Sequence, residues 1–328
     1  MGQAKPMFLP MTPHAFILRA REGKNPFWMY LVGILLVFLA NILGSLPYTL
    51  VASLRMAERP VPLSPEELTN PMALGLHPAI GLFLLLLSFA AGVLALWFMM
   101  RFLHERPFLS LVNIRDRFNL EKFGTAAGVW MALMAGFELV AYFMDPDNYT
   151  FTFEAWAFFP TLLVALIMVP IQTSMEELLF RGYLLQGLGL GTRRPWLALL
   201  LTSIGFGLLH GANPEVATFG PLILLYYIGF GLAMALVTLM DEGLELALGV
   251  HAANNVYGAL FVTFPSSAMQ TPALFTLSEY PVTLMTVVWV VATLIFIGFV
   301  AYRYQWQDWA KLWRPLAPAS PAEEPLEE

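Results

Sequence analysis

The chain has 328 residues, of which 58% are hydrophobic and only 12% charged, and its mean hydropathy is +0.67. Soluble domains carry about twice that charged fraction, so a soluble globular protein is excluded and a polytopic membrane protein is predicted. The absence of cysteine excludes disulfide scaffolds, cysteine nucleophiles and cysteine metal sites, while the net charge of −6 says little, because placement of charge matters more than its sum in a membrane protein.

Eight apolar runs are candidate membrane spans, since a span needs about 20 predominantly apolar residues. In chain order they cover residues 27–51, 78–103, 123–144, 155–185, 196–210, 218–240, 244–264 and 282–304. No cleavable signal pattern precedes the first run, so we expect it to be retained. The fifth run is short, and we expect it to be tilted or buried among the others. The sequence therefore predicts an all-α polytopic membrane protein, a bundle of about eight transmembrane helices.

Basic residues are distributed unevenly between the connecting segments. If the N-terminus is cytoplasmic and the eight runs alternate, the inner segments hold 14 Lys and Arg residues and the outer segments hold two, leaving aside Arg181 inside the fourth run. Cytoplasmic loops carry an excess of these residues, so both termini are predicted to be cytoplasmic and loop 56–71 external. The pattern favours a multi-pass protein of a bacterial plasma (inner) membrane.

Residues 174–186 read SMEELLFRGYLLQ and place three charges in the fourth run, where each is costly. Glu177 and Arg181 are four residues apart with the acid first, which is the favourable order for a helical ion pair. Glu176 points about 100° away from Glu177. One interpretation is a helix end whose charges snorkel toward the headgroups, and the other is a functional site. Because Glu176 stands roughly 20 Å from the glycine-rich helix end at 187–194, snorkelling is disfavoured.

Two further polar motifs lie in later runs. FGLLH places Phe206 and His210 near the end of the fifth run, and HAANN places His251 and Asn255 four residues apart on one face of the seventh. Each motif alone is compatible with packing or with hydrogen bonding between helices, and Asn254, turned away by one residue, fits the latter better. Together with the first motif they supply a carboxylate, two imidazoles and a carboxamide, a sufficient set for activating water and stabilising an oxyanion.

The order EExxxR, FxxxH and HxxxN on successive membrane helices resembles the CPBP family of intramembrane proteases. That family includes Rce1-like CAAX prenyl endopeptidases and bacterial bacteriocin-processing and immunity proteins. The resemblance covers about residues 160–264, and every motif position is present. It implies an all-α bundle with the site in a water-filled cavity, where a glutamate-activated water hydrolyses a peptide bond. Glu176 is then the general base, His210 helps to hold the water, and His251 and Asn255 stabilise the oxyanion.

The resemblance gives supporting roles to Glu177, Arg181 and Phe206 and implies that no cofactor is needed. Zinc stays open as an alternative, because a glutamate and two histidines can ligate it; its ligands would be Glu176, His210 and His251. The chain has no HExxH motif, so the metal-free mechanism is favoured.

Other classes of protein are weighed by the same residues. No intramembrane serine motif is evident, and no predicted span has an Asp in its interior for an aspartyl pair. A transporter also places polar residues at mid-membrane, but the only comparable extra charge is Glu138. The main alternative is a catalytically silent membrane scaffold or a bacteriocin-immunity-type protein. The expected partners are the lipid bilayer and a membrane-anchored peptide or protein substrate, with no nucleic acid; the substrate's sequence is not indicated.

These inferences divide the chain into five segments. They are a cytoplasmic N-terminal segment 1–26, N-terminal transmembrane helices 27–151, a catalytic core 152–265, a last transmembrane helix with a Trp-rich interfacial segment 266–314, and a tail 315–328 that its composition predicts to be disordered.

Overall fold

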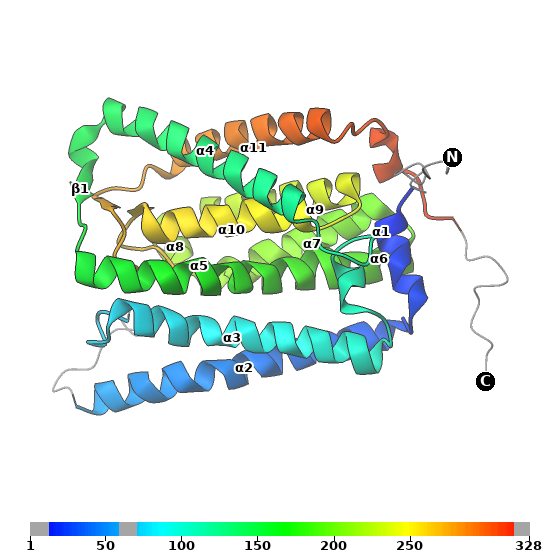
Figure 1. Ribbon diagram of the computed structural model, residues 1–328, viewed down its shortest axis with the longest axis horizontal. Helices are drawn as coiled ribbons and strands as arrows, with labels where there is room; N and C mark the ends of the chain where they lie inside the picture. Colours follow the sequence, from blue (N-terminus) through cyan, green and yellow to red (C-terminus); the bar gives the residue numbers. More distant parts are fainter. Residues whose placement is uncertain (1–12, 59–70, 318–328) are drawn as a thin grey trace, which may run out of the picture.

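The computed structural model describes residues 13–58 and 71–317, and within them the chain is almost entirely helical (Figure 1). The predicted all-α fold is confirmed. The helices are α1 Ala15–Leu18, α2 Phe27–Ala57, α3 Pro78–Phe98, α4 Leu120–Met144, α5 Ala155–Glu177, α6 Leu185–Thr192, α7 Pro195–Leu209, α8 Pro214–Phe219, α9 Leu222–Asp241, α10 Glu245–Leu260 and α11 Val282–Arg303.

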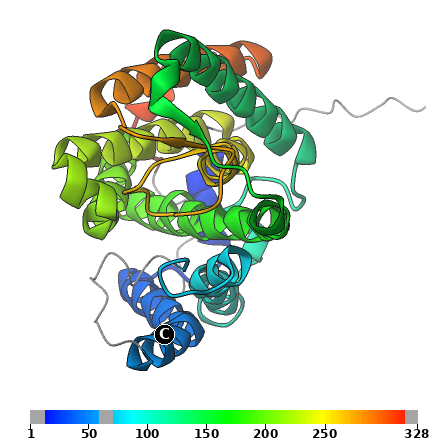
Figure 2. The same ribbon diagram turned by 90° about the vertical axis from the view of Figure 1, so that its left-hand side faces the viewer.

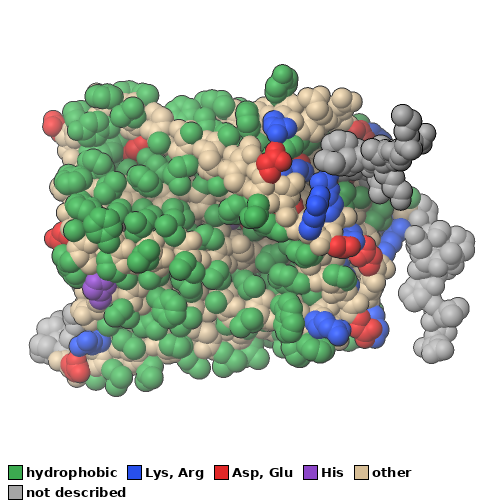
Figure 3. All heavy atoms as spheres, viewed as in Figure 1, with side chains coloured by type: hydrophobic (Ala, Val, Ile, Leu, Met, Phe, Trp, Pro, Cys, Tyr) green, Lys and Arg blue, Asp and Glu red, His purple; other side chains and the backbone are tan. Residues whose placement is uncertain are grey.

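Seven helical segments in the described part of the chain are long and apolar enough to cross a membrane. They are 27–57, 78–103, 120–144, 155–192, 195–212, 222–241 and 282–303. Their outward faces are apolar, and in Figure 3 hydrophobic side chains cover the middle of the molecule while most charged ones gather at one end. Helices that are apolar on the outside as well as inside belong in a bilayer, so the chain is a multi-pass membrane protein.

The run predicted as the seventh span is α10, which has 16 residues and lies in the centre of the bundle (Figure 2). It packs against α4, α5 and α9, so protein rather than lipid surrounds it. Gly249 lets α4 approach closely, since a Cβ atom there would lie 2.9 Å from Cβ of Ala126. A helix enclosed by other helices need not be long enough to cross the lipid, and this is why α10 is shorter than a membrane span.

Helix α5 continues into α6 through a π-helical segment, Leu178–Leu184. The whole segment 155–192 is therefore one uninterrupted helical rod of 38 residues. The π turns begin directly after Glu177 and include Arg181, two of the charged residues of the first motif. Such irregular turns often occur at functional sites.

A small sheet closes the end of the bundle that is remote from the two chain termini (Figure 1). It consists of β1 Tyr149–Phe151, β2 Val262–Thr263 and β3 Phe275–Leu277, in the order β1-β3-β2. Strand β1 runs antiparallel and β2 parallel to β3. The strands lie outside the spanning helices, where backbone groups do not all have to be hydrogen-bonded within the protein as they must be in lipid. We call this the sheet end, and the opposite one the terminal end.

Buried polar side chains fix the terminal end. Glu242, in the turn between α9 and α10, accepts hydrogen bonds from the backbone N–H of His14 (3.2 Å) and of Phe16 (2.7 Å) and from Lys311 Nζ (2.7 Å). Nearby, the buried His104 ring contacts the Lys24 carbonyl oxygen at 2.7 Å through Nδ1 and the Tyr183 hydroxyl at 2.8 Å through Nε2. Both ends of the described chain are thereby tied to the bundle.

Two predicted segments extend beyond the described residues. Most of loop 56–71 and most of tail 315–328 lie there, so the predictions made for them are not addressed by the structure.

Candidate active site

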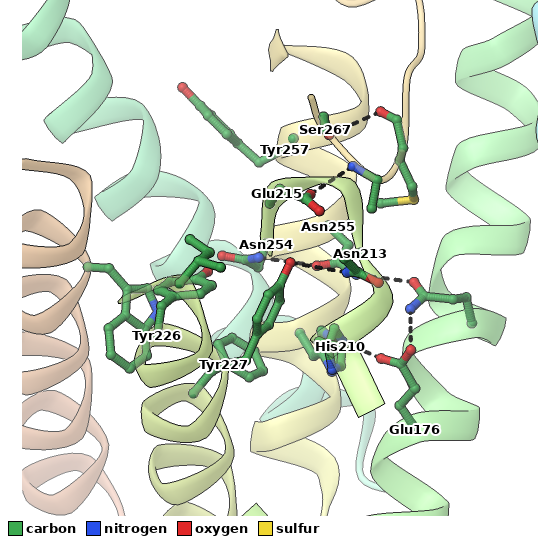
Figure 4. A pocket seen from close by; sticks show the side chains of 18 of the residues that line it. Glu176, His210, Asn213, Glu215, Tyr226, Tyr227, Asn254, Asn255, Tyr257 and Ser267 are labelled. Carbon is green, nitrogen blue, oxygen red and sulfur yellow. Dashed lines mark hydrogen bonds and ion pairs between the residues drawn. The ribbon is translucent and has the colours of Figure 1, made fainter. Parts of the chain in front are cut away.

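Residues from each of the three sequence motifs line one cavity of about 650 Å³ between the helices, although Glu177 and Arg181 do not. Glu176 comes from α5, His210 follows the end of α7, and His251 and Asn255 come from α10 (Figure 4). These side chains come from distant parts of the sequence, and the packing of α5 against α10, and of α7 and α10 against α9, brings them together.

Glu176 has one oxygen in use and one without a hydrogen bond. Its Oε1 accepts a hydrogen bond from Gln172 Nε2 at 2.9 Å. Its Oε2 has no hydrogen-bond partner and lies 3.4 Å from His251 Nε2. Gln172 also accepts, through Oε1, a hydrogen bond from Asn255 Nδ2 at 3.1 Å. Gln172 thus joins the carboxylate to the carboxamide in one chain of hydrogen bonds (Figure 4).

Glu177, adjacent in sequence, is completely buried and engaged elsewhere. Its Oε1 accepts from Arg181 Nη1 at 2.9 Å and from His251 Nδ1 at 2.7 Å. A carboxylate only accepts hydrogen bonds, so Nδ1 of His251 carries a proton. The approach of Glu176 Oε2 to the other ring nitrogen is favourable when that nitrogen is protonated too. His251 therefore lies between the two carboxylates, and Arg181 pairs with one of them.

Phe206 lies against three basic side chains of the cluster. The guanidinium carbon of Arg181 is 4.2 Å from the centre of the Phe206 ring, within the range of a cation–π interaction. The same ring lies 4.5 Å from the His210 ring and 6.0 Å from the His251 ring, centre to centre. Phe206 therefore fixes the positions of three site residues by packing.

His210 is oriented by the backbone of its own helix and by an aromatic neighbour. Its Nδ1 lies 2.8 Å from the Phe206 carbonyl oxygen, an acceptor, which makes Nδ1 the protonated nitrogen and leaves Nε2 for another partner. The ring stacks on Tyr227 with centres 4.3 Å apart. Tyr227 in turn accepts a hydrogen bond from Asn213 Nδ2 at 3.2 Å.

Several residues of the site were not predicted from the sequence. Gln172 stands one helical turn before Glu176, and an amide at that spacing in an apolar run is the signal that could have found it. Asn254, by contrast, was predicted to hydrogen-bond between helices and does so, since its Oδ1 accepts from Trp130 Nε1 at 3.2 Å and its Nδ2 donates to Asn255 Oδ1 at 3.1 Å. Glu215 on α8 also lines the cavity and had no pattern to mark it.

The predicted zinc ligands Glu176, His210 and His251 all line the cavity. Within the described residues, however, no three His, Asp or Glu side chains are grouped as a metal site would require. The arrangement instead gives separate hydrogen-bonding roles to each of the three residues.

Comparison with known proteins agrees with the motifs. The family model for Rce1-like type II CAAX prenyl endopeptidases matches residues 155–257, a stretch that contains all the motif residues. A Bacillus subtilis (strain 168) protein, uncharacterized protein YyaK, is 31% identical over 267 residues, which is 80% of this chain and 87% of that protein. No solved structure matches the chain.

Proposed function

The chain belongs to the Rce1-like CPBP family of intramembrane proteases, and from that premise we propose that it cleaves a peptide bond of a membrane-anchored peptide or protein tail with a glutamate-activated water. The observation that carries the proposal is the division of labour between adjacent carboxylates. Glu177 is paired through Oε1 with Arg181 and His251 and does not line the cavity, whereas Glu176 lines the cavity and its Oε2 has no hydrogen-bond partner. A general base needs such a free oxygen beside the water that it deprotonates.

In the proposed reaction, Glu176 Oε2 takes a proton from a water that His210 Nε2 helps to hold. The oxygen of that water attacks the carbonyl carbon, and the electron pair of the C=O bond moves to the carbonyl oxygen. When the tetrahedral intermediate collapses, the C–N bond breaks and the leaving amine takes the proton from Glu176. Water and peptide are consumed, and an acid and an amine are formed.

The oxyanion is proposed to be held by Asn255 and His251. Asn255 Nδ2 uses one N–H on Gln172 and retains a second. In this proposal His251 Nε2 carries a proton that faces Glu176 before reaction. Once Glu176 has been neutralised by the proton from water, His251 Nε2 donates a hydrogen bond to the oxyanion instead. The positive ring thus keeps an anionic partner throughout, and such preorganised donors are the largest contribution in many acyl-transfer sites.

The decisive test is Glu176→Gln. We expect this variant to fold and to lose cleavage, because an amide cannot accept the proton from water. Membrane peptides from a deletion strain would be compared by mass spectrometry after complementation with wild type, Glu176→Gln, or Glu279→Gln, which alters an exposed acid outside the cavity. If Glu176→Gln restores the wild-type peptide pattern, the protein acts as a silent scaffold or immunity factor and the enzyme proposal fails.

We propose that the reaction needs no cofactor. Treatment of purified protein with a zinc chelator should leave the cleavage rate unchanged. Loss of activity that is restored by added zinc would instead assign Glu176, His210 and His251 as ligands of a catalytic metal.

We also propose that the protein lies in the plasma (inner) membrane with both termini in the cytoplasm, which puts the sheet end outside. The excess of basic residues in the segments assigned as inner supports this orientation. Reporter fusions after Ala317 should be active in the cytoplasm, and fusions at Glu279 outside it. The reverse result would invert the assignment.

A further inference from the structure

We propose that the sheet end of the cavity is a recognition site for a cationic group of the substrate, an ammonium or a guanidinium, and that Glu215 is its anion. This inference rests on the proposed function for its biological meaning, because it concerns the same cavity. It implies that the substrate carries Lys, Arg or a free amino group close to the bond that is cleaved.

The first argument is the charge of the cavity wall. Three glutamates line the cavity, and among the described residues no lysine or arginine does so. Glu138 already accepts a hydrogen bond from the Tyr149 hydroxyl at 2.6 Å, and Glu176 faces His251. Glu215 is the acid left over. The histidines of the lining, His210 and His251, lie beside Glu176, so the part of the wall around Glu215 offers an acid without a neighbouring cation and favours positively charged groups.

The second argument is the state of Glu215 itself. The residue is only 7% exposed, so it is nine-tenths buried. Its Oε1 accepts a hydrogen bond from the backbone N–H of Ala268 at 2.7 Å. Its Oε2 has no hydrogen-bond partner, and Glu215 forms no ion pair with any residue that the structure describes. Burial raises the pKa of Glu215 because the charged form loses water.

A buried carboxylate oxygen without a partner is costly unless a ligand satisfies it. Figure 4 shows the Glu215 side chain within the group that lines the cavity, with Asn213 and Asn255 near it on the side of Glu176. The carboxylate therefore lies in the cavity wall with its unpaired oxygen buried. A cation there would complete the ion pair that the protein leaves open.

The third argument is the aromatic surface of the same region. Tyr280 and Phe264 stack with ring centres 4.2 Å apart, and both line the cavity. Tyr227, stacked on His210, also lines it. Ring faces attract cations, and the attraction grows when water is excluded. An acid among aromatic rings is the surrounding that an ammonium or guanidinium group prefers.

Binding can be tested without a known substrate and without catalysis. Purified protein in nanodiscs at pH 8 would be titrated with three amphiphiles of equal chain length: dodecylamine, dodecanol and dodecanoate. We expect dodecylamine to bind about 10- to 100-fold more tightly than dodecanol, the effect of one hydrogen bond to a charged group. Dodecanoate should bind more weakly than either.

The preference for the amine should vanish in Glu215→Gln, which keeps an acceptor for Ala268, and persist in the control Glu279→Gln. Glu176→Gln should keep it as well, because catalysis is not involved. Equal binding of amine and alcohol to the wild type would overturn the inference, whatever the variants do. So would an amine preference that survives in Glu215→Gln.

The two proposals fail separately. A protein that prefers the amine but gives no cleavage in cells would refute the protease function and leave the cation site. A protein that cleaves in a Glu176-dependent manner but binds amine and alcohol alike would refute the cation site alone.

Discussion

Replacing Arg181 by Met tests whether the buried ion pair holds the site together. Arg181 and Glu177 are both 0% exposed, and their charged atoms lie 2.9 Å apart. Removing the guanidinium leaves Glu177 buried, with His251 as its one remaining partner among the described residues. Breaking a buried pair in this way costs about 3–5 kcal/mol of unfolding free energy. The lost contact with the Phe206 ring is part of the same cost, so the two are not added.

The double variant Glu177→Gln, Arg181→Met should recover most of that loss. It removes both charges, and the glutamine oxygen can still accept the hydrogen bond from His251 Nδ1. Two matched neutral groups avoid the desolvation that two buried charges require, so the coupling energy between the two sites should be at least about 2 kcal/mol.

Recovery of the fold should not bring recovery of activity. Glu177 accepts the hydrogen bond from His251 Nδ1 with a charged oxygen, and an amide cannot replace that charge. The double variant should therefore be stable yet cleave its substrate slowly, which separates the role of the pair in folding from its role in the site.

The four proteins of this cycle would be unfolded by SDS in mixed micelles, followed by tryptophan fluorescence, and assayed for cleavage. The control is the exposed pair Arg303 and Glu121, whose atoms are 2.8 Å apart but whose side chains are 52% and 64% exposed. Its coupling should be about 0–1 kcal/mol. Wild-type stability in Arg181→Met would refute the reasoning.

Three further predictions follow from other contacts. Gln172→Leu should fold but lower the cleavage rate, because Glu176 Oε1 loses the hydrogen bond that Gln172 donates and Asn255 loses its acceptor. The pH optimum of the residual activity should move if Gln172 positions Glu176, and an unchanged rate would contradict this role. Asn255→Ala should lower the cleavage rate by about 10²–10³, the usual effect of losing one oxyanion donor. Asn254→Ala should mainly lower stability, because Asn254 accepts a hydrogen bond from Trp130 on another helix. Equal effects of the two variants on the rate would argue against Asn255 as an oxyanion donor. Burial lowers the pKa of His104, so the folded protein binds fewer protons there than the unfolded chain does. The contribution of His104 to the free energy of unfolding should be fully present above about pH 6.5 and should be lost as the pH falls through the lowered pKa. The stability of His104→Gln should depend less on pH over that range.

Charged residues inside apolar runs could be found from the sequence because each is costly there and needs a reason. Glu176, Glu177 and Arg181 stood out in this way, and the i to i+4 spacing predicted the ion pair that the structure contains. His251 and Asn255 were placed on one face of a helix by the same spacing, and both line the cavity.

The parts that escaped prediction depend on neighbours far away in the chain. Nothing in residues 244–264 says that α4, α5 and α9 enclose them, so α10 was expected to have the length of a span. Gln172 is one amide in an apolar run, and its importance comes from Asn255, 83 positions later. Glu215 lies in the first turn of α8, where an acid is common, and only the fold shows that its second oxygen is buried and unpaired.

The attachment of both chain ends to Glu242 has a consequence for biosynthesis. The ribosome makes this acid 69 residues before Lys311, the cation that satisfies it. Until then the nascent chain carries an unneutralised carboxylate between two helices that are already inserting. Chains interrupted before Lys311 lack this ion pair, so the turn between α9 and α10 gains its last partner only when synthesis has passed α11.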